Sequence, residues 1–95
     1  MKMTCHLRIA GRVQGVGYRD GLRSAARAAG IAGWVRNRRD GTVEAVVQGS
    51  PDAIEEILAW AKHGPPAARV TDVSASAATG ELDRSYSGFE MLPTA

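Results

Sequence analysis

The amino-acid sequence predicts one α+β sandwich, in which two helices cover one face of a mainly antiparallel sheet. Apolar residues make up 44% of the chain and charged residues 23%, a balance typical of folded, soluble proteins. Segments with the two-residue period of strands alternate with two segments of helical period, in the order β-α-β-β-α-β. A chain of 95 residues suits a single core, so residues 1–95 are expected to form one domain.

The first strand and the first helix are predicted by the spacing of their apolar side chains. Residues 4–9 alternate between polar and apolar side chains, which indicates a strand with one buried face that ends at Gly11. Residues 20–29 carry apolar side chains at positions i, i+3, i+4 and i+7, which indicates an amphipathic helix capped by Gly30.

A hairpin follows the first helix. Residues 33–37 and 42–48 are typical of strands, and the turn of residues 38–41 between them ends in Asp-Gly. Residues 50–52 then supply a serine cap, a proline at the first helical position and an acidic first turn for a second helix. An apolar stripe extends this helix to the Gly-Pro-Pro segment within residues 62–66.

The C-terminal part of the chain is predicted to add two strands. They cover residues 69–75 and 86–91, and the polar residues 77–81 are interpreted as a loop between them. Two helices that bracket a hairpin form the split β-α-β arrangement, so the predicted fold is ferredoxin-like with a short extra C-terminal strand. This scaffold hosts binding modules as well as enzymes, so function has to be argued from a site.

The segment GRVQGVGYR, which joins the first strand to the first helix, is the candidate site. A loop that enters a helix N-terminus has backbone N–H groups without intrahelical partners, and this geometry suits an anion. Gly15 and Gly17 allow close approach to those amides, while Val13 and Val16 can anchor the loop to the core. Arg19 can offer two parallel hydrogen bonds to phosphate oxygens. The predicted phosphate-binding residues are Gln14, Gly15, Val16, Gly17, Tyr18 and Arg19.

The glycine pattern alone does not exclude an ordinary glycine-rich connection, because its spacing matches neither the P-loop nor the dinucleotide fingerprint. The distribution of charge adds to the case for an anion. Residues 1–40 carry nine Lys or Arg and two Asp, a net charge of +7, whereas residues 41–95 sum to −5. A positive field of this kind attracts nucleic acid, an acidic membrane surface or a small phosphorylated substrate.

The sequence resembles the acylphosphatase family over nearly its whole length. GRVQGVGYR is similar to the family signature commonly written G-x-V-Q-G-V-x-F-R, and GIAGWVRNRRDGTVEAVVQG resembles its second signature region. The resemblance continues through residues 50–51 and the approach to the next strand, residues 64–70. It implies a ferredoxin-like enzyme that hydrolyses the carboxyl–phosphate bond of acyl phosphates to carboxylate and inorganic phosphate, without a metal or other cofactor.

The resemblance also implies roles for individual residues. By motif position, the phosphate-binding arginine of the family falls on Arg19 and its water-orienting asparagine falls on Asn37. Tyr18 stands where phenylalanine is usual, which adds a hydroxyl that needs a partner. The chemistry fits these residues, because a carboxylate leaving group is a weak base and needs no strong general acid. The proton of the attacking water is expected to pass to a phosphate oxygen of the substrate.

Other functions are weighed against this one. An RNA-binding module of the same fold would stack bases on aromatic side chains of its third strand, whereas residues 42–48 have none. A small-ligand regulatory module would usually be tethered to an enzyme domain. A sensor that binds acyl phosphate without hydrolysing it would not need both Arg19 and Asn37. Cys5 is interpreted as a core residue. Arg36, Arg38 and Arg39 could raise the positive potential around the site, but they are interpreted as a solvated turn.

The composition and the apolar runs of the sequence bear on metal binding, on membrane insertion and on the cellular compartment. With one cysteine and no clustered His, Asp or Glu, no metal site is expected. No apolar run approaches the roughly 20 residues that cross a bilayer, and no signal peptide is evident at the N-terminus. We therefore expect a cytoplasmic protein that binds neither nucleic acid nor membrane. The family resemblance implies that it binds a small acyl phosphate and releases inorganic phosphate, and we expect it to be a monomer.

Overall fold

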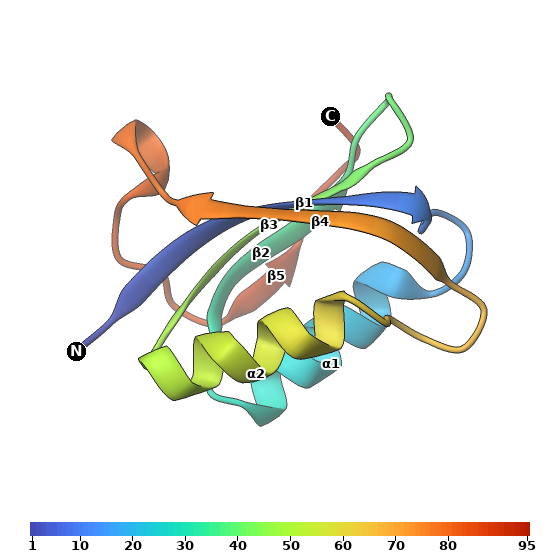
Figure 1. Ribbon diagram of the computed structural model, residues 1–95. Helices are drawn as coiled ribbons and strands as arrows, with labels where there is room; N and C mark the ends of the chain where they lie inside the picture. Colours follow the sequence, from blue (N-terminus) through green and yellow to red (C-terminus); the bar gives the residue numbers. More distant parts are fainter.

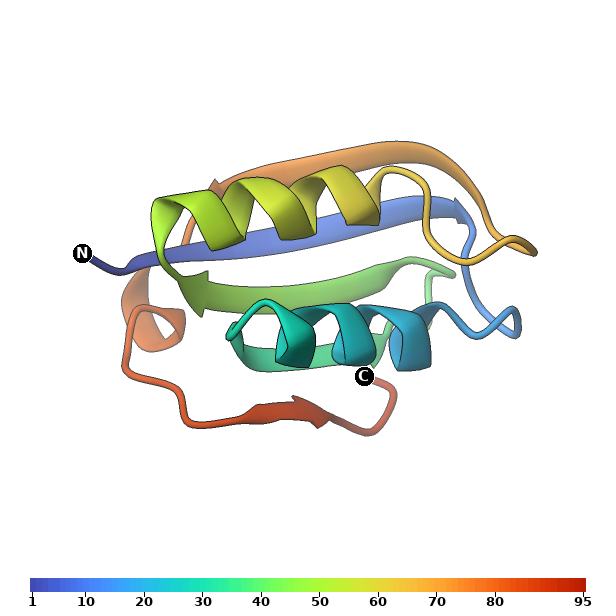
Figure 2. The same cartoon turned by 90° about the horizontal axis from the view of Figure 1, so that it is seen from below.

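The backbone is arranged in two layers, as the computed structural model of all 95 residues shows (Figures 1 and 2). One layer is a five-stranded sheet. The other consists of two helices, α1 (Tyr18–Ala28) and α2 (Pro51–Ala61), which lie side by side on one face of the sheet. The predicted fold class is therefore confirmed, including both helices on the same face.

The sheet is mainly antiparallel. Its strands in chain order are β1 (Met3–Arg12), β2 (Ala32–Asn37), β3 (Val43–Gly49), β4 (Arg69–Ala77) and β5 (Phe89–Met91). Their order across the sheet is β4-β1-β3-β2-β5, which can be followed from the upper to the lower edge in Figure 2. Only the outermost pair, β2 with β5, is parallel. The two central strands, β1 and β3, pair over seven residues and carry much of the core.

The strand β1 is longer than predicted, and Gly11 does not end it. The register of β1 against β4 shifts between Ala10 and Gly11, so Gly11 lies at a bulge inside the strand. Its φ is 120°, and a Cβ atom there would stand 2.1 Å from the carbonyl oxygen of Arg69. The glycine is needed because the neighbouring strand approaches the backbone so closely.

The helix α1 begins at Tyr18, two residues before the predicted start. Gly17 precedes it in the left-handed conformation, with φ 81°, and this turn of the backbone allows the helix to begin earlier. At the other end the cap residue is Ala29, and Gly30 follows it with φ 71°. As a consequence, Arg19 belongs to the first helical turn and not to the loop.

The second helix follows its prediction closely. The Ser50 hydroxyl oxygen accepts a hydrogen bond from the Ala53 backbone N–H at 3.2 Å, and Pro51 occupies the first helical position. The C-terminal segments differ in detail. A short 3₁₀ turn, η1 (Gly80–Leu82), lies where a loop was predicted, and β5 starts only at Phe89. The Tyr86 N–H donates to the side-chain oxygen of Gln48 and not to a neighbouring strand, which delays that start.

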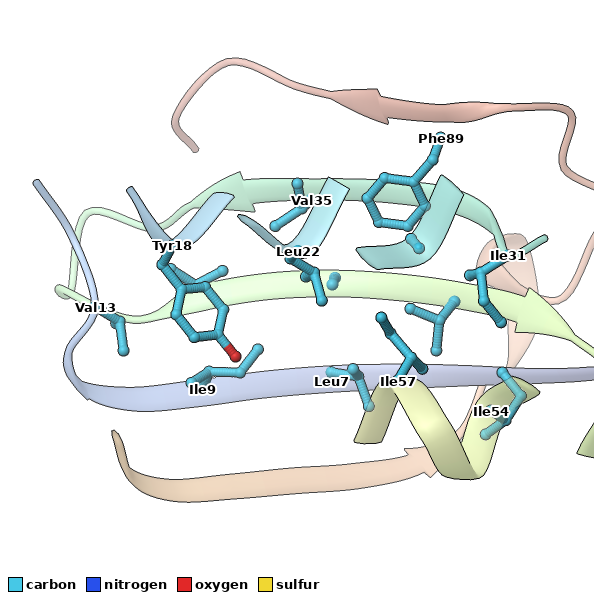
Figure 3. Close-up of a cluster of buried hydrophobic side chains, with 14 residues drawn as sticks. Leu7, Ile9, Val13, Tyr18, Leu22, Ile31, Val35, Ile54, Ile57 and Phe89 are labelled. Atoms are coloured by element: carbon cyan, nitrogen blue, oxygen red, sulfur yellow. The ribbon is translucent and has the colours of Figure 1, made fainter. Parts of the chain in front are cut away.

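The hydrophobic core lies between the helices and the sheet. Figure 3 shows that Leu7 and Ile9 project from β1 toward Leu22 of α1 and Ile57 of α2. Fourteen buried side chains form this cluster. Its members Val13 and Tyr18 flank the loop between β1 and α1, so that the core holds the loop at both ends.

Candidate active site

The loop between β1 and α1 is anchored at its two ends. Val13 and Tyr18 are each 1% exposed, and Val16 between them is half-buried and packs against the core. The loop lies at the same end of the molecule as the turn between β2 and β3 (Figures 1 and 2). The predicted anchoring by Val13 and Val16 is thus present in the structure.

The backbone N–H groups of residues 14–20 form a continuous run without protein acceptors. The first hydrogen bond of α1 runs from the Gly21 N–H to the Gly17 carbonyl oxygen at 3.0 Å, and none of the seven preceding amides donates within the protein. Gly15 and Gly17 have φ of 73° and 81°, and no atom from beyond the adjoining residues lies within 4 Å of where their Cβ atoms would be. The space over these amides is therefore open, and the dipole of α1 favours negative charge there.

Arg19 is the one cationic residue within this run of amides. It lies half-buried in the first turn of α1 and takes part in no ion pair and no side-chain hydrogen bond. One turn later, Arg23 is engaged, since its guanidinium donates to Asp20 at 2.9 Å. The Arg19 guanidinium is thus uncommitted, and its backbone N–H belongs to the row of uncommitted amides.

Asn37 is the last residue of β2, and its side chain makes no hydrogen bond to the protein. Its Oδ1 is the one buried side-chain nitrogen or oxygen atom in the structure that lacks a partner. An unpaired buried acceptor costs about 1–3 kcal/mol, so native proteins rarely tolerate one without a reason. The backbone of Asn37 is held, because its carbonyl oxygen accepts from the Ala95 N–H at 3.0 Å.

The side chain of Gln14 connects the loop to the turn that follows Asn37. Its Nε2 donates to the carbonyl oxygens of Arg38 at 2.7 Å and of Thr42 at 2.9 Å. Gln14 is among the predicted phosphate-binding residues, and of its two donor groups only the backbone N–H remains free. The bridge brings the loop against the residue next to Asn37, although the two lie far apart in the sequence.

Tyr18 has a partner for the hydroxyl that distinguishes it from phenylalanine. The hydroxyl donates to the carbonyl oxygen of Ala61 at 2.8 Å, in the last turn of α2. Burial raises the pKa of Tyr18, so the hydroxyl stays a neutral donor. The ring also packs against Trp60 with centroids 5.3 Å apart. These contacts tie the first turn of α1, and with it Arg19, to the second helix.

A charged cluster on the other face of the sheet holds both neighbours of Asn37. Glu44 of β3 is only 5% exposed, and its carboxylate accepts from Arg36 at 2.8 Å and from Arg38 at 3.3 Å. Its other oxygen lies 2.6 Å from Nε2 of His6. Burial disfavours the charged form of Glu44, but the hydrogen bonds from His6 and Arg36 outweigh it and lower the pKa of Glu44.

The prediction that Arg36 and Arg38 are merely solvated is wrong. The signal that identifies their partner is the strand register, in which Glu44 stands directly opposite Arg36 in β2. That register is not fixed by the sequence pattern of one strand, so the cluster was missed. In the turn itself, the hydroxyl and N–H of Thr42 donate to Asp40 and lower the pKa of that carboxyl.

The remaining reactive groups lie apart from the loop. Burial raises the pKa of the Cys5 thiol, in keeping with a core position. The structure holds no group of three or more His, Cys, Asp or Glu side chains placed to share a metal ion. None of the helices has the length and apolar character needed to span a membrane.

A family model, a relative in sequence and two solved structures point to the same family. The acylphosphatase family model matches residues 5–91. An acylphosphatase from Thiobacillus denitrificans is 55% identical over 87 residues, which cover 92% of this chain and 93% of the relative. The acylphosphatase structure from Coxiella burnetii has a TM-score of 0.88 at 34% identity and covers 96% of this chain and 93% of that one. The Bacillus subtilis acylphosphatase structure has a TM-score of 0.87 at 33% identity, with coverages of 97% and 99%.

Proposed function

The chain belongs to the acylphosphatase family of enzymes, which hydrolyse acyl phosphates, and from this premise we propose how its residues divide the reaction. The free amides of residues 14–19 and the Arg19 guanidinium hold the phosphoryl group. Asn37 positions the water that attacks it. The observation that carries the proposal is the run of amides without acceptors, which begins in the loop and ends in the first turn of α1.

The loop supplies hydrogen bonds where charge concentrates during phosphoryl transfer. The transferred group carries negative charge on its three equatorial oxygens, and donors that are already oriented stabilise that charge without reorganising. The amides are fixed between Val13 and Tyr18, both buried, so their directions are set before substrate arrives. Open space over Gly15 and Gly17 lets the phosphate oxygens reach the backbone.

Arg19 adds charge and orientation to the backbone donors. A guanidinium can donate two parallel hydrogen bonds to phosphate oxygens, and no carboxylate competes for it in this structure. The contact from the Tyr18 hydroxyl to Ala61 fixes the helical turn that carries Arg19. We therefore assign Arg19 to binding the phosphoryl group and to stabilising the transition state.

Asn37 offers a donor and an acceptor that the protein leaves unused. Its buried Oδ1 can accept a hydrogen bond from the attacking water and hold it in line with the bond that breaks. The water oxygen attacks phosphorus, the bond to the acyl oxygen breaks, and its electron pair leaves with the carboxylate. The proton of the water passes to a phosphate oxygen of the substrate. The weak basicity of the carboxylate makes a protein acid unnecessary.

The assignment of Arg19 is tested by comparison with its neighbour on the same helix. Arg19→Gln is expected to lower kcat/KM for a small acyl phosphate by about 10²-fold or more, and to weaken competitive inhibition by inorganic phosphate. Arg23→Gln, which removes a charge that is paired with Asp20, is expected to leave both near wild type. Wild-type kinetics in Arg19→Gln would refute the assignment.

The same assay tests the reaction class and the need for a metal. We expect hydrolysis of the acyl phosphate to persist after treatment with a chelator and to exceed hydrolysis of a simple phosphate monoester. Loss of activity in the chelator, restored by a divalent cation, would contradict a reaction carried by amides, arginine and asparagine alone.

A further inference from the structure

We infer that Gln14 is a positioning residue that sets the placement of Asn37 relative to the phosphate-binding loop, an inference that rests on the proposed function. Gln14 acts through a bridge, defined here as the two hydrogen bonds from its Nε2 to the carbonyl oxygens of Arg38 and Thr42. It reaches the turn after Asn37 with its side chain while its backbone lies in the loop.

The bridge is the only polar link between residues 13–16 of the loop and the rest of the protein. Residues 13–16 neither donate nor accept a backbone hydrogen bond, and apart from Gln14 none of them uses its side chain in one. The apolar anchors Val13 and Val16 hold the loop on the core but, being non-directional, do not fix its direction relative to the turn between β2 and β3. The two hydrogen bonds of 2.7 and 2.9 Å supply that direction.

The other end of the bridge is rigid and adjoins Asn37. The Arg38 N–H donates to the Thr42 carbonyl at 2.8 Å, and the Arg38 carbonyl also accepts from Gly41 at 3.1 Å. The Arg38 guanidinium is held by the buried carboxylate of Glu44. Gln14 therefore binds across both ends of a closed turn, at the residue directly after Asn37.

This arrangement separates positioning from binding. Phosphate is bound by amides and Arg19, which remain when the Gln14 side chain is changed. The water on Asn37 and the phosphorus atom are held by two different segments, and a shift between them of about 1 Å can lower a rate by as much as 10²-fold. Loss of the bridge is thus expected to reduce kcat far more than it reduces the affinity for phosphate.

The variant Gln14→Met tests this inference, because methionine has a similar length but no donor for the two carbonyls. We expect kcat to fall by roughly tenfold, while the inhibition constant of inorganic phosphate changes less than about twofold. Gln48→Met is the matched control. Gln48 also donates from Nε2 to two acceptors, Thr4 at 2.9 Å and Arg84 at 2.7 Å, but it lies near the other end of β3. Its loss is expected to lower the thermal midpoint and leave kcat unchanged.

A double-mutant cycle identifies the residue through which Gln14 acts. If it acts through Asn37, Gln14→Met lowers kcat much less in the Asn37→Ala background than in the wild type. Gln14→Glu is a second variant for the same cycle, because its carboxylate cannot donate to the two carbonyl oxygens and repels them. Full additivity in the cycle, or an unchanged kcat in both Gln14 variants, would overturn the inference while an impaired Asn37→Ala enzyme upholds the proposed function. An unimpaired Asn37→Ala enzyme would overturn both.

Discussion

Single residues in this protein act through backbone conformation as much as through side-chain chemistry. Gly15 and Gly30 have almost the same left-handed φ, 73° and 71°, and at neither does an atom from beyond the adjoining residues lie within 4 Å of the Cβ position. They differ in place, because Gly15 lies among the free amides of the loop whereas Gly30 follows the end of α1. Substitutions at these two glycines therefore distinguish a loss of stability caused by backbone strain, expected at both, from a loss of phosphate affinity, expected only at Gly15.

We predict that Gly15→Val and Gly30→Val lose similar stability but differ in function. A side chain at a left-handed position costs roughly 1–2 kcal/mol in each case. Only the valine at position 15 stands over the amides, so only that variant is expected to weaken inhibition by inorganic phosphate. Urea unfolding and phosphate inhibition of both purified variants check this. Equal phosphate affinity in the two variants would argue against the loop as the binding site.

At this scale the sequence predicts roles for isolated residues but not the contacts that set them. The positive φ of Gly15 and Gly17 is a conformation that glycine, with no Cβ, was expected to allow in this loop. The unpaired Oδ1 of Asn37 does not follow from any pattern, since it depends on which side chains surround the end of β2. The bridge from Gln14 likewise joins residues 24 and 28 positions apart.

Among the elements, the β2–β3 hairpin is the one whose geometry most directly determines the site. It carries Asn37 at the end of β2, and Glu44 of β3 holds the side chains on either side of Asn37. The lowered pKa of Glu44 shows that the folded protein favours the carboxylate over the protonated form. By linkage, this contribution to the free energy of unfolding is present above the ordinary pKa of 4.5 and is lost as the pH falls below it.

We predict that the stability difference between wild type and Glu44→Gln depends on pH. It is expected to be largest near pH 7, where glutamine leaves Arg36 and Arg38 without a counter-charge. It is expected to shrink as the pH falls below about 4.5, because Glu44 of the unfolded chain is protonated first and the folded carboxylate, with its lowered pKa, follows at lower pH. Urea unfolding of both proteins across this range measures the difference. A gap that stays constant down to about pH 3 would contradict this role for the carboxylate.

The elements themselves were largely predictable, because each has a clear period or cap. Ser50 and Pro51 mark the start of α2 as expected. The errors occur where a tertiary contact overrides the local pattern. The pairing with β4, whose register shifts at Gly11, continues β1 past that glycine, and the bond from Tyr86 to Gln48 shortens the last strand. Both depend on a contact with a distant segment, which the pattern of a single strand does not reveal.

For the whole molecule, the fold is what joins the two halves of the candidate site. Arg19 lies in the element after β1, whereas Asn37 ends β2, and these strands are separated in the sheet by β3. The loop and the hairpin turn meet because both lie at the same end of the sheet (Figure 2). The motif match could name both residues in advance, but only the complete β-α-β-β core brings their segments into contact.

The central claim is that binding and water positioning reside on these two separate segments, and Asn37→Ala tests it most directly. We predict that kcat for a small acyl phosphate falls by about 10²-fold, while inorganic phosphate inhibits the variant as well as it inhibits the wild type. In Arg19→Gln, by contrast, phosphate inhibition is expected to weaken. An Asn37→Ala enzyme with normal kcat, or one that loses phosphate affinity as Arg19→Gln does, would contradict the account.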